Sequence, residues 1–166
     1  GTHSIQRPDG KFVTFYDDPA TKIYDPIANT FVNGPRMINA LGGGSHSILR
    51  PDGKFLIIEA NTSGSASTSI YDPIANTIST GTPLTANADD GSHSILRPDG
   101  KFLIISGRTS VNTSIYDPVS FAILSGPTTT ANVAQGAFSL QHSDGKFLVV
   151  HGNGVNTTSI YDPIAN

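Results

Sequence analysis

The chain has 166 residues and no cysteine, so it is long enough for a stable core but excludes disulfide bonds, thiolate zinc sites and cysteine nucleophiles. Ten Lys and Arg against thirteen Asp and Glu give a formal net charge of -3, and these charges are scattered, so no nucleic-acid partner is indicated. The apolar runs are only a few residues long, far below the ~20 that a membrane-spanning helix requires.

A hairpin is the clearest predicted element, in the segment HSILRPDGKFLII at 46–58. His46–Leu49 is predicted as a strand and Arg50–Gly53 as a tight turn, because Pro presets φ and Gly accepts a positive φ. Lys54–Ile58 returns as a second strand. Its apolar residues do not alternate with polar ones, which indicates a strand covered on both faces.

Two further strands follow the hairpin. Thr68–Tyr71 is predicted as the third, Asp72-Pro73 opens a turn, and a fourth begins at Thr77–Ser79. No segment has helical periodicity. This part of the chain therefore predicts four antiparallel strands, which we call strands a, b, c and d.

The same pattern occurs four times. Asp-Gly-Lys-Phe starts at residues 9, 52, 99 and 144, with spacings of 43, 47 and 45, which is typical of repeat architectures. Tyr-Asp-Pro recurs too, and it always lies 28 residues before the next Asp-Gly, so the length differences fall in the loop between strands b and c. The repeats are predicted at 1–43, 44–90, 91–135 and 136–166, the last without its outer strand d.

A four-stranded antiparallel sheet that is buried on both faces needs a similar sheet on either side. A β-propeller provides this arrangement, so the sequence predicts an all-β chain, one repeat domain over 1–166 built from propeller blades. A β-sandwich would show cleaner alternation, because each of its sheets exposes one face. A β-solenoid would have a shorter period and no need of an Asp-Gly hairpin in every copy.

The copies resemble kelch repeats, especially the bacterial kelch-like repeats of the galactose oxidase type. The matching elements are His46-Ser47, Pro51-Asp52-Gly53, the apolar strand Phe55–Ile58 and Tyr71-Asp72-Pro73. The usual Gly-Gly after strand b is replaced by Glu59-Ala60, Ser106-Gly107 and His151-Gly152. The resemblance implies a propeller fold. Galactose oxidase itself has a copper site with a Tyr cross-linked to Cys, which a chain without cysteine cannot form, so no cofactor is expected.

The strand order places two kinds of loop at opposite ends of each blade. The a–b and c–d turns are nearly the same in all copies, whereas the b–c and d–a loops differ. Recognition of a glycan or a protein is therefore expected at the varied end. The candidate ligand-binding residues are Glu59, Asn61, Asp89, Asp90, Arg108 and His151.

The repeated histidines and aspartates have structural interpretations. His3, His46 and His93 begin strand a in three copies and are weak candidates for a metal site on the axis of the ring. Phe138 takes this place in the fourth copy, and a histidine that is hydrogen-bonded to a neighbouring loop is the favoured interpretation. The Asp of Tyr-Asp-Pro is interpreted as a turn residue that accepts backbone N–H groups, rather than as an acid or base.

Three Asn-x-Ser/Thr sequons lie in b–c loops. Asn61, Asn112 and Asn156 are candidate N-glycosylation sites in a secreted eukaryotic protein, or ordinary loop residues. No nucleophile, base and orienting acid occur at a recognisable spacing. No catalytic residue is predicted, and an enzyme of the kelch-like group is kept only as a third alternative.

Four copies without a last strand d predict an incomplete ring. Two chains could close an eight-bladed ring, the chain could belong to a longer array, or chains could join end to end in a filament. The similarity of the copies favours assembly through equivalent interfaces. The first hypothesis is a non-catalytic structural or adhesive module that assembles with copies of itself. Low charge and loops rich in Asn, Thr, Ser and Gly favour an extracellular or cell-surface location. A ligand-binding propeller is the alternative.

Overall fold

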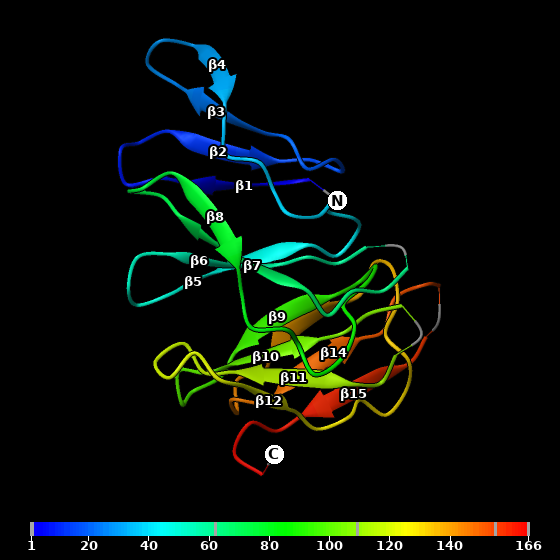
Figure 1. Ribbon diagram of the computed structural model, residues 1–166. Coiled ribbons are helices and arrows are strands. Elements are labelled where there is room, and N and C mark those ends of the chain that lie inside the picture. The colour runs from blue at the N-terminus through cyan, green and yellow to red at the C-terminus, as the bar shows by residue number, and fades with distance from the viewer. Residues whose placement is uncertain (1, 62, 109, 155, 166) are drawn as a thin grey trace.

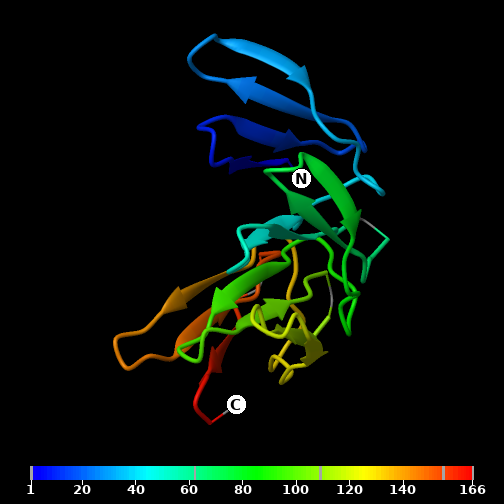
Figure 2. The same cartoon turned by 60° about the vertical axis from the view of Figure 1, so that its left-hand side comes forward.

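The computed structural model describes residues 2–61, 63–108, 110–154 and 156–165, and in these residues the strands form four separate antiparallel sheets, one for each repeat. The sheets follow one another along the chain, so that the N-terminus lies at the first sheet and the C-terminus beyond the last (Figures 1 and 2). The four-stranded blades predicted from the sequence are confirmed.

The strands keep the order a, b, c, d across each blade. The first blade contains β1 (His3–Gln6), β2 (Phe12–Phe15), β3 (Thr21–Asp25) and β4 (Thr30–Asn33). The second contains β5 (His46–Leu49), β6 (Phe55–Ile58), β7 (Thr68–Asp72) and β8 (Thr77–Thr80). The third contains β9 (His93–Leu96), β10 (Phe102–Ile105), β11 (Thr113–Tyr116) and β12 (Ile123–Ser125). The fourth contains β13 (Phe138–Gln141), β14 (Phe147–Val150) and β15 (Thr158–Tyr161), and no strand d is present in its described residues.

The a–b turns depend on the Asp-Gly pair. Gly53 has a φ of 78°, in the left-handed region that favours glycine. The Asp52 carboxylate accepts the Lys54 backbone N–H, and the Lys54 ammonium lies 3.0 Å from the Asp72 carboxylate in the c–d turn. The two kinds of turn therefore contact each other at one end of the blade, as the strand order predicts.

Three apolar clusters form the core, one at each joint between consecutive blades. Each cluster combines one face of a blade with the opposite face of the next. In β6 and β10, which have a blade on both sides, three of four residues are buried, whereas in β2 of the first blade burial alternates. The predicted burial of strand b on both faces is thus confirmed for the inner blades.

An arginine of the a–b turn reaches across each joint. Arg7 donates hydrogen bonds to the Tyr71 hydroxyl (3.1 Å) and to the Asn76 side chain (2.8 Å) of the second blade. At the next joint, the Arg50 guanidinium stacks 3.8 Å from the Phe121 ring centre, and the buried Tyr116 hydroxyl has no hydrogen-bond partner among the residues that the structure describes. Tyr71 and Tyr116 occupy equivalent positions and are equally buried, but only the Tyr71 hydroxyl is hydrogen-bonded to an arginine.

This difference predicts unequal effects of two matched substitutions. Tyr71→Phe should lower the free energy of unfolding by about 1.5 kcal/mol, because it removes a hydrogen bond to a charged group. Tyr116→Phe should leave this free energy unchanged or raise it, because it removes a buried hydroxyl that no described residue hydrogen-bonds. Urea unfolding of both variants checks this, and equal losses would contradict it.

Candidate functional site

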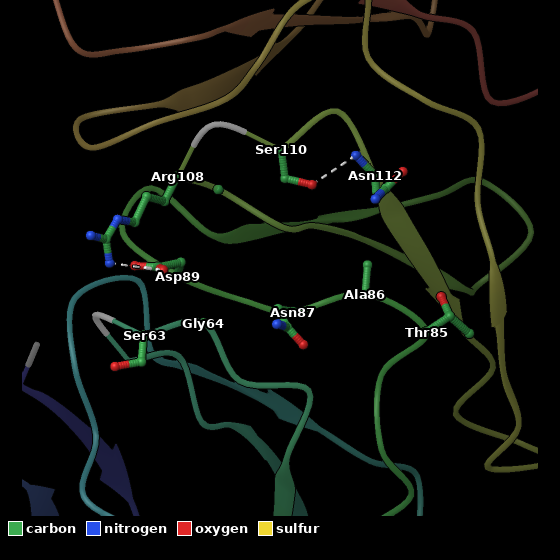
Figure 3. A pocket seen from close by; sticks show the side chains of 10 residues that line it. Ser63, Gly64, Thr85, Ala86, Asn87, Asp89, Arg108, Ser110 and Asn112 are labelled. Atoms are coloured by element: carbon green, nitrogen blue, oxygen red, sulfur yellow. Dashed lines mark hydrogen bonds and ion pairs between the residues drawn. The ribbon is translucent and has the colours of Figure 1, made fainter.

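A polar groove lies at the varied end, where the b–c loops of the second and third blades meet the d–a loop that connects them. It encloses about 530 Å³ (Figure 3). The groove is lined by Ser63, Gly64, Thr85, Ala86, Asn87, Asp89, Gly107, Arg108, Ser110 and Asn112.

Backbone hydrogen bonds fix the walls of this groove. Ser65 of the b–c loop pairs with Ala88 of the d–a loop as an isolated β-bridge. The Asp89 N–H donates to the Ser106 carbonyl (2.8 Å), and the Arg108 N–H donates to the Asp90 carbonyl (2.8 Å). Because the loops are held together in this way, the groove is preformed in the free chain.

One ion pair defines the electrostatics of the groove. The Arg108 guanidinium lies 3.4 Å from the Asp89 carboxylate (Figure 3). The Asp89 side chain is 8% exposed, whereas that of Arg108 is 51% exposed, so the carboxylate lies in the floor and the guanidinium at the rim. A guanidinium offers several N–H donors, and amide and hydroxyl groups surround it, so this groove suits a small polar ligand.

Glu59 and His151 do not line the groove. They are 1% and 0% exposed, so the expectation that they face a ligand at the varied end is corrected. The Glu59 carboxylate accepts hydrogen bonds from Ser69 of strand c and from Asn39 of the preceding d–a loop. His151 is bonded in the same way to Ser159 of strand c (2.7 Å). The residue after strand b points into the blade, where it fastens strand c.

The remaining candidates lie at or near the varied end. Asp90 is half-buried and packs against Gly43, where a Cβ atom would overlap its carboxylate. Asn112 and Asn156 are exposed and Asn61 is half-buried; the middle residue of the first sequon, Thr62, lies outside the described residues. Glycosylation at these positions stays a prediction.

The three repeated histidines form a chain of contacts between blades. Each Nε2 lies within hydrogen-bond distance of the serine that follows the equivalent histidine or phenylalanine in the next blade. The pairs are His3–Ser47 (2.6 Å), His46–Ser94 (2.6 Å) and His93–Ser139 (2.7 Å). The favoured structural interpretation is therefore supported, but the partner belongs to the innermost strand of the next blade rather than to a loop.

Burial controls the ionisation of these histidines. It lowers the pKa of His3 and His46 from 6.5 to about 4, and it also lowers the pKa of His93. The Nδ1 of His46 lies 2.8 Å from the Gly44 carbonyl oxygen, so it carries the proton, and Nε2 accepts the Ser94 hydroxyl. Neutral imidazoles are thus built into the joints.

The aspartates of Tyr-Asp-Pro act in turns, as interpreted from the sequence. Asp72 accepts the backbone N–H groups of Ile74 (3.0 Å) and Ala75 (2.9 Å). These hydrogen bonds, together with the Lys54 ammonium, hold the pKa of the half-buried Asp72 carboxyl below its usual value. The same pair of bonds is present at Asp25, Asp117 and Asp162.

A solved structure has the same arrangement of sheets. It is described as a novel fungal alcohol oxidase with catalytic diversity among the AA5 family, in complex with copper. The match covers 98% of this chain with a TM-score of 0.56 and 12% sequence identity. This chain has a kelch-like propeller fold. It spans about half of the oxidase, 52% of that chain, and at this identity the likeness shows the fold alone.

No protein-family model matches the sequence, and no curated protein matches it. In the described residues no three His, Asp or Glu side chains are grouped so that they could hold a metal. The described residues also include no helix long and apolar enough to cross a membrane.

The outer face of the fourth blade is apolar, and among the described residues no other blade packs against it. Its side chains form two rows across the strands, and the equivalent rows of the other blades are buried in the joints. We call this surface the C-terminal face. It comprises Phe138, Leu140, Leu148, Val150 and Ile160. Phe138 is 47% exposed, Leu140 54% and Ile160 62%, whereas Ile48 and Ile95, which are equivalent to Leu140, are 4% exposed.

The outer face of the first blade is more polar. Thr14 and Lys22 of this face are equivalent to Ile57 and Ser69 of the second blade, which are buried in a joint. The Lys22 ammonium donates to the Asn33 side chain (2.6 Å). Sequence reasoning overlooked the difference between the two end faces, although alignment of the copies shows Lys22 at a position where the others have serine.

Proposed function

We propose that this kelch-like chain is a non-catalytic scaffold that associates with a second copy through its C-terminal face. The apolar character of that face supports the proposal, because the same rows in the first three blades are covered by the next blade. Exposed apolar patches of this kind mark interaction surfaces. In keeping with the loop composition, we place the module outside the cell or at its surface.

The partner face is proposed to be a second C-terminal face, in a two-fold arrangement. A joint between the C-terminal face and the first blade of another copy, built like the internal joints, would bury Lys22 where Ser69 lies. Burial of the charged Lys22 ammonium, whose hydrogen-bond partner Asn33 is neutral, is costly. A two-fold contact instead matches Leu140 and Ile160 with an identical apolar surface. This argument favours pairs of chains over rings or filaments.

The substitution Leu140→Lys tests this association. It should shift the chain from a two-chain species to a single chain in sedimentation velocity, with at least a tenfold weaker dimer. The control Leu49→Lys changes an equally exposed leucine (59%) outside the C-terminal face and should leave the dimer intact. Lys22→Glu should also have no effect. Loss of association on Lys22→Glu, with none on Leu140→Lys, would contradict the two-fold arrangement.

A second candidate function is recognition of a polar ligand, such as a glycan, in the groove at Arg108. The preformed walls and the exposed guanidinium favour it. A glycan array probed with the chain should give a selective signal that Arg108→Ala reduces at least tenfold, because a charge-assisted hydrogen bond would be lost. Arg36→Ala, a substitution outside the groove, is the control. An array without selective signal would remove this candidate.

A further inference from the structure

The polar groove between the second and third blades has charged residues at two positions where the other joints do not. Asp89 lies in the d–a loop, four residues before strand a, and Arg108 lies in the b–c loop, three residues after strand b. The fold does not require this ion pair, because the other joints have uncharged residues at the same two positions. These are Gly42 and Asn61 in the first joint, and Ala134 and Asn153 in the third.

Arg108 also has a backbone conformation that suits asparagine better than arginine. Its φ is +31°, and Asn153, at the same position in the fourth blade, has a φ of +55°. The backbone N–H of each residue donates to the neighbouring d–a loop, Arg108 to the Asp90 carbonyl (2.8 Å) and Asn153 to the Gln135 carbonyl (2.8 Å). Asparagine tolerates the left-handed region better than arginine does. An arginine held in this strained conformation points to a role for its side chain.

The ion pair leaves most of the Arg108 guanidinium available to a ligand. Among the described residues, Nη1 alone has a partner, the Asp89 carboxylate. The distance of 3.4 Å is longer than the ~2.7–2.9 Å of a tight charge-assisted hydrogen bond. The Asp89 carboxylate itself is held by the Asp90 N–H, which donates to its other oxygen (2.7 Å). The acidic group is therefore fixed in the floor, whereas the basic group has free N–H donors.

The two charges of the groove cancel each other. Among the described residues that line the groove, Asp89 and Arg108 alone are charged, and the others have hydroxyl, amide or small side chains. A negatively charged ligand that reaches Arg108 also approaches the buried Asp89 carboxylate, and repulsion between the two is strong where water is largely excluded. An uncharged ligand meets no such repulsion, and its hydroxyl groups can both accept from Arg108 and donate to the carboxylate.

We propose that Asp89 determines the specificity of the groove: because it neutralises Arg108, the groove selects uncharged glycans over acidic ones. This inference rests on the proposed recognition of a glycan in the groove. The Asp89 side chain is only 8% exposed, so dissolved salt screens its charge little. Asn87 and Asn112 line the same groove (Figure 3) and supply amide donors and acceptors for the hydroxyl groups of an uncharged sugar.

A glycan array with matched pairs tests the proposal on the full chain. Each pair contains a glucose, galactose or mannose oligosaccharide and the same oligosaccharide sulfated at a primary hydroxyl. The uncharged member of a bound pair should give a signal about tenfold above that of the sulfated member, as one close like-charge contact implies. A stronger signal from the sulfated members would overturn the proposal but keep glycan recognition. Absence of signal from all pairs would remove glycan recognition and this inference with it.

Asp89→Asn separates a role in specificity from a structural role. It removes the charge but keeps a side-chain oxygen that can accept the Asp90 N–H. The sulfated members should gain about tenfold in signal, because the Arg108 guanidinium is no longer neutralised. Equal weakening of both members would show a structural role and contradict the proposal. The matched control is Asp99→Asn in an a–b turn at the opposite end of the third blade, and it should leave the preference unchanged.

Arg108→Asn gives the groove the residue found at the same position in the fourth blade. It should lower the signal of the uncharged glycans about tenfold, because the guanidinium donors are lost. Urea unfolding should show an unchanged or raised free energy of unfolding, because asparagine relieves the strain at a positive φ. Unchanged glycan binding by this variant would overturn the proposal.

Discussion

Gly91→Ala is expected to unfold the chain or to lower its free energy of unfolding by about 4 kcal/mol or more. Gly91 has a φ of +86°, and a Cβ atom there would overlap the Ala134 carbonyl oxygen of the next d–a loop. The Ala134 oxygen belongs to the backbone, and so does the Cα that would carry the new Cβ, so neither can move without disturbing the joint between the third and fourth blades. The expected loss therefore has two parts: the cost of holding alanine at a positive φ, and the cost of the overlap with the Ala134 carbonyl.

Gly100→Ala separates these two costs. Gly100 has nearly the same φ, +80°, but nothing lies within 4 Å of its added Cβ. Its substitution should cost about 1 kcal/mol, the value of a left-handed conformation for a non-glycine residue. Urea unfolding of the two variants measures the difference. Equal losses would mean that the close approach of the loops does not hold the joint.

Acid is expected to destabilise the chain through its buried histidines. His46 has a pKa of about 4 in the folded chain, against 6.5 for an unperturbed histidine, because burial disfavours the charged ring. Between these values the unfolded state binds more protons than the folded state, so stability falls as the pH drops from 6.5 towards 4. His46 alone should lose about 3 kcal/mol over this window, and His3 adds to the loss in the same direction.

Urea unfolding at pH 6.5 and pH 4.5 measures this loss. His46→Gln removes the titrating ring and should flatten the dependence of the free energy of unfolding on pH. The turn aspartates do not account for a loss between these pH values. Their pKa values lie below 3.8, so their contribution to the free energy of unfolding is lost only at lower pH. Equal stability of the unmodified chain at the two pH values would contradict the burial of neutral histidines.

Much of the fold follows from local sequence. The Asp-Gly turn, the apolar strand b and Tyr-Asp-Pro each specify one backbone conformation, and their repetition reveals the period. The strands of the second blade were predicted to within one residue at each end, because Pro, Gly and Asp mark their limits chemically. Because strand b is apolar on both faces, each sheet needs a similar sheet on either side, and this requirement predicts a propeller.

The candidate site was harder to predict. Position after a strand suggested that Glu59 and His151 were loop residues, but only the contacts with strand c show that they point inwards. Arg108 and Asp89 were identified as candidates, yet their pairing across the groove depends on the backbone bonds of two different loops. Periodicity does not encode such contacts, because they join segments that differ between the copies.

The exposure of the two end blades was also hard to predict from the sequence. Leu140 and Ile48 occupy equivalent positions, and the sequence gives no sign that one is covered and the other exposed. That difference depends on what lies beyond the blade. Lys22 is more informative, since a charged residue at a position that is buried in the inner joints indicates a face that stays in water.

The mass of the unmodified particle tests the central claim most directly. Light scattering after size exclusion, over a range of concentrations, should give a species of twice the 17.4 kDa of one chain, and growth should stop at two chains because the C-terminal faces cover each other. A single chain at all concentrations would contradict association through this face, and open-ended polymers would contradict its two-fold arrangement.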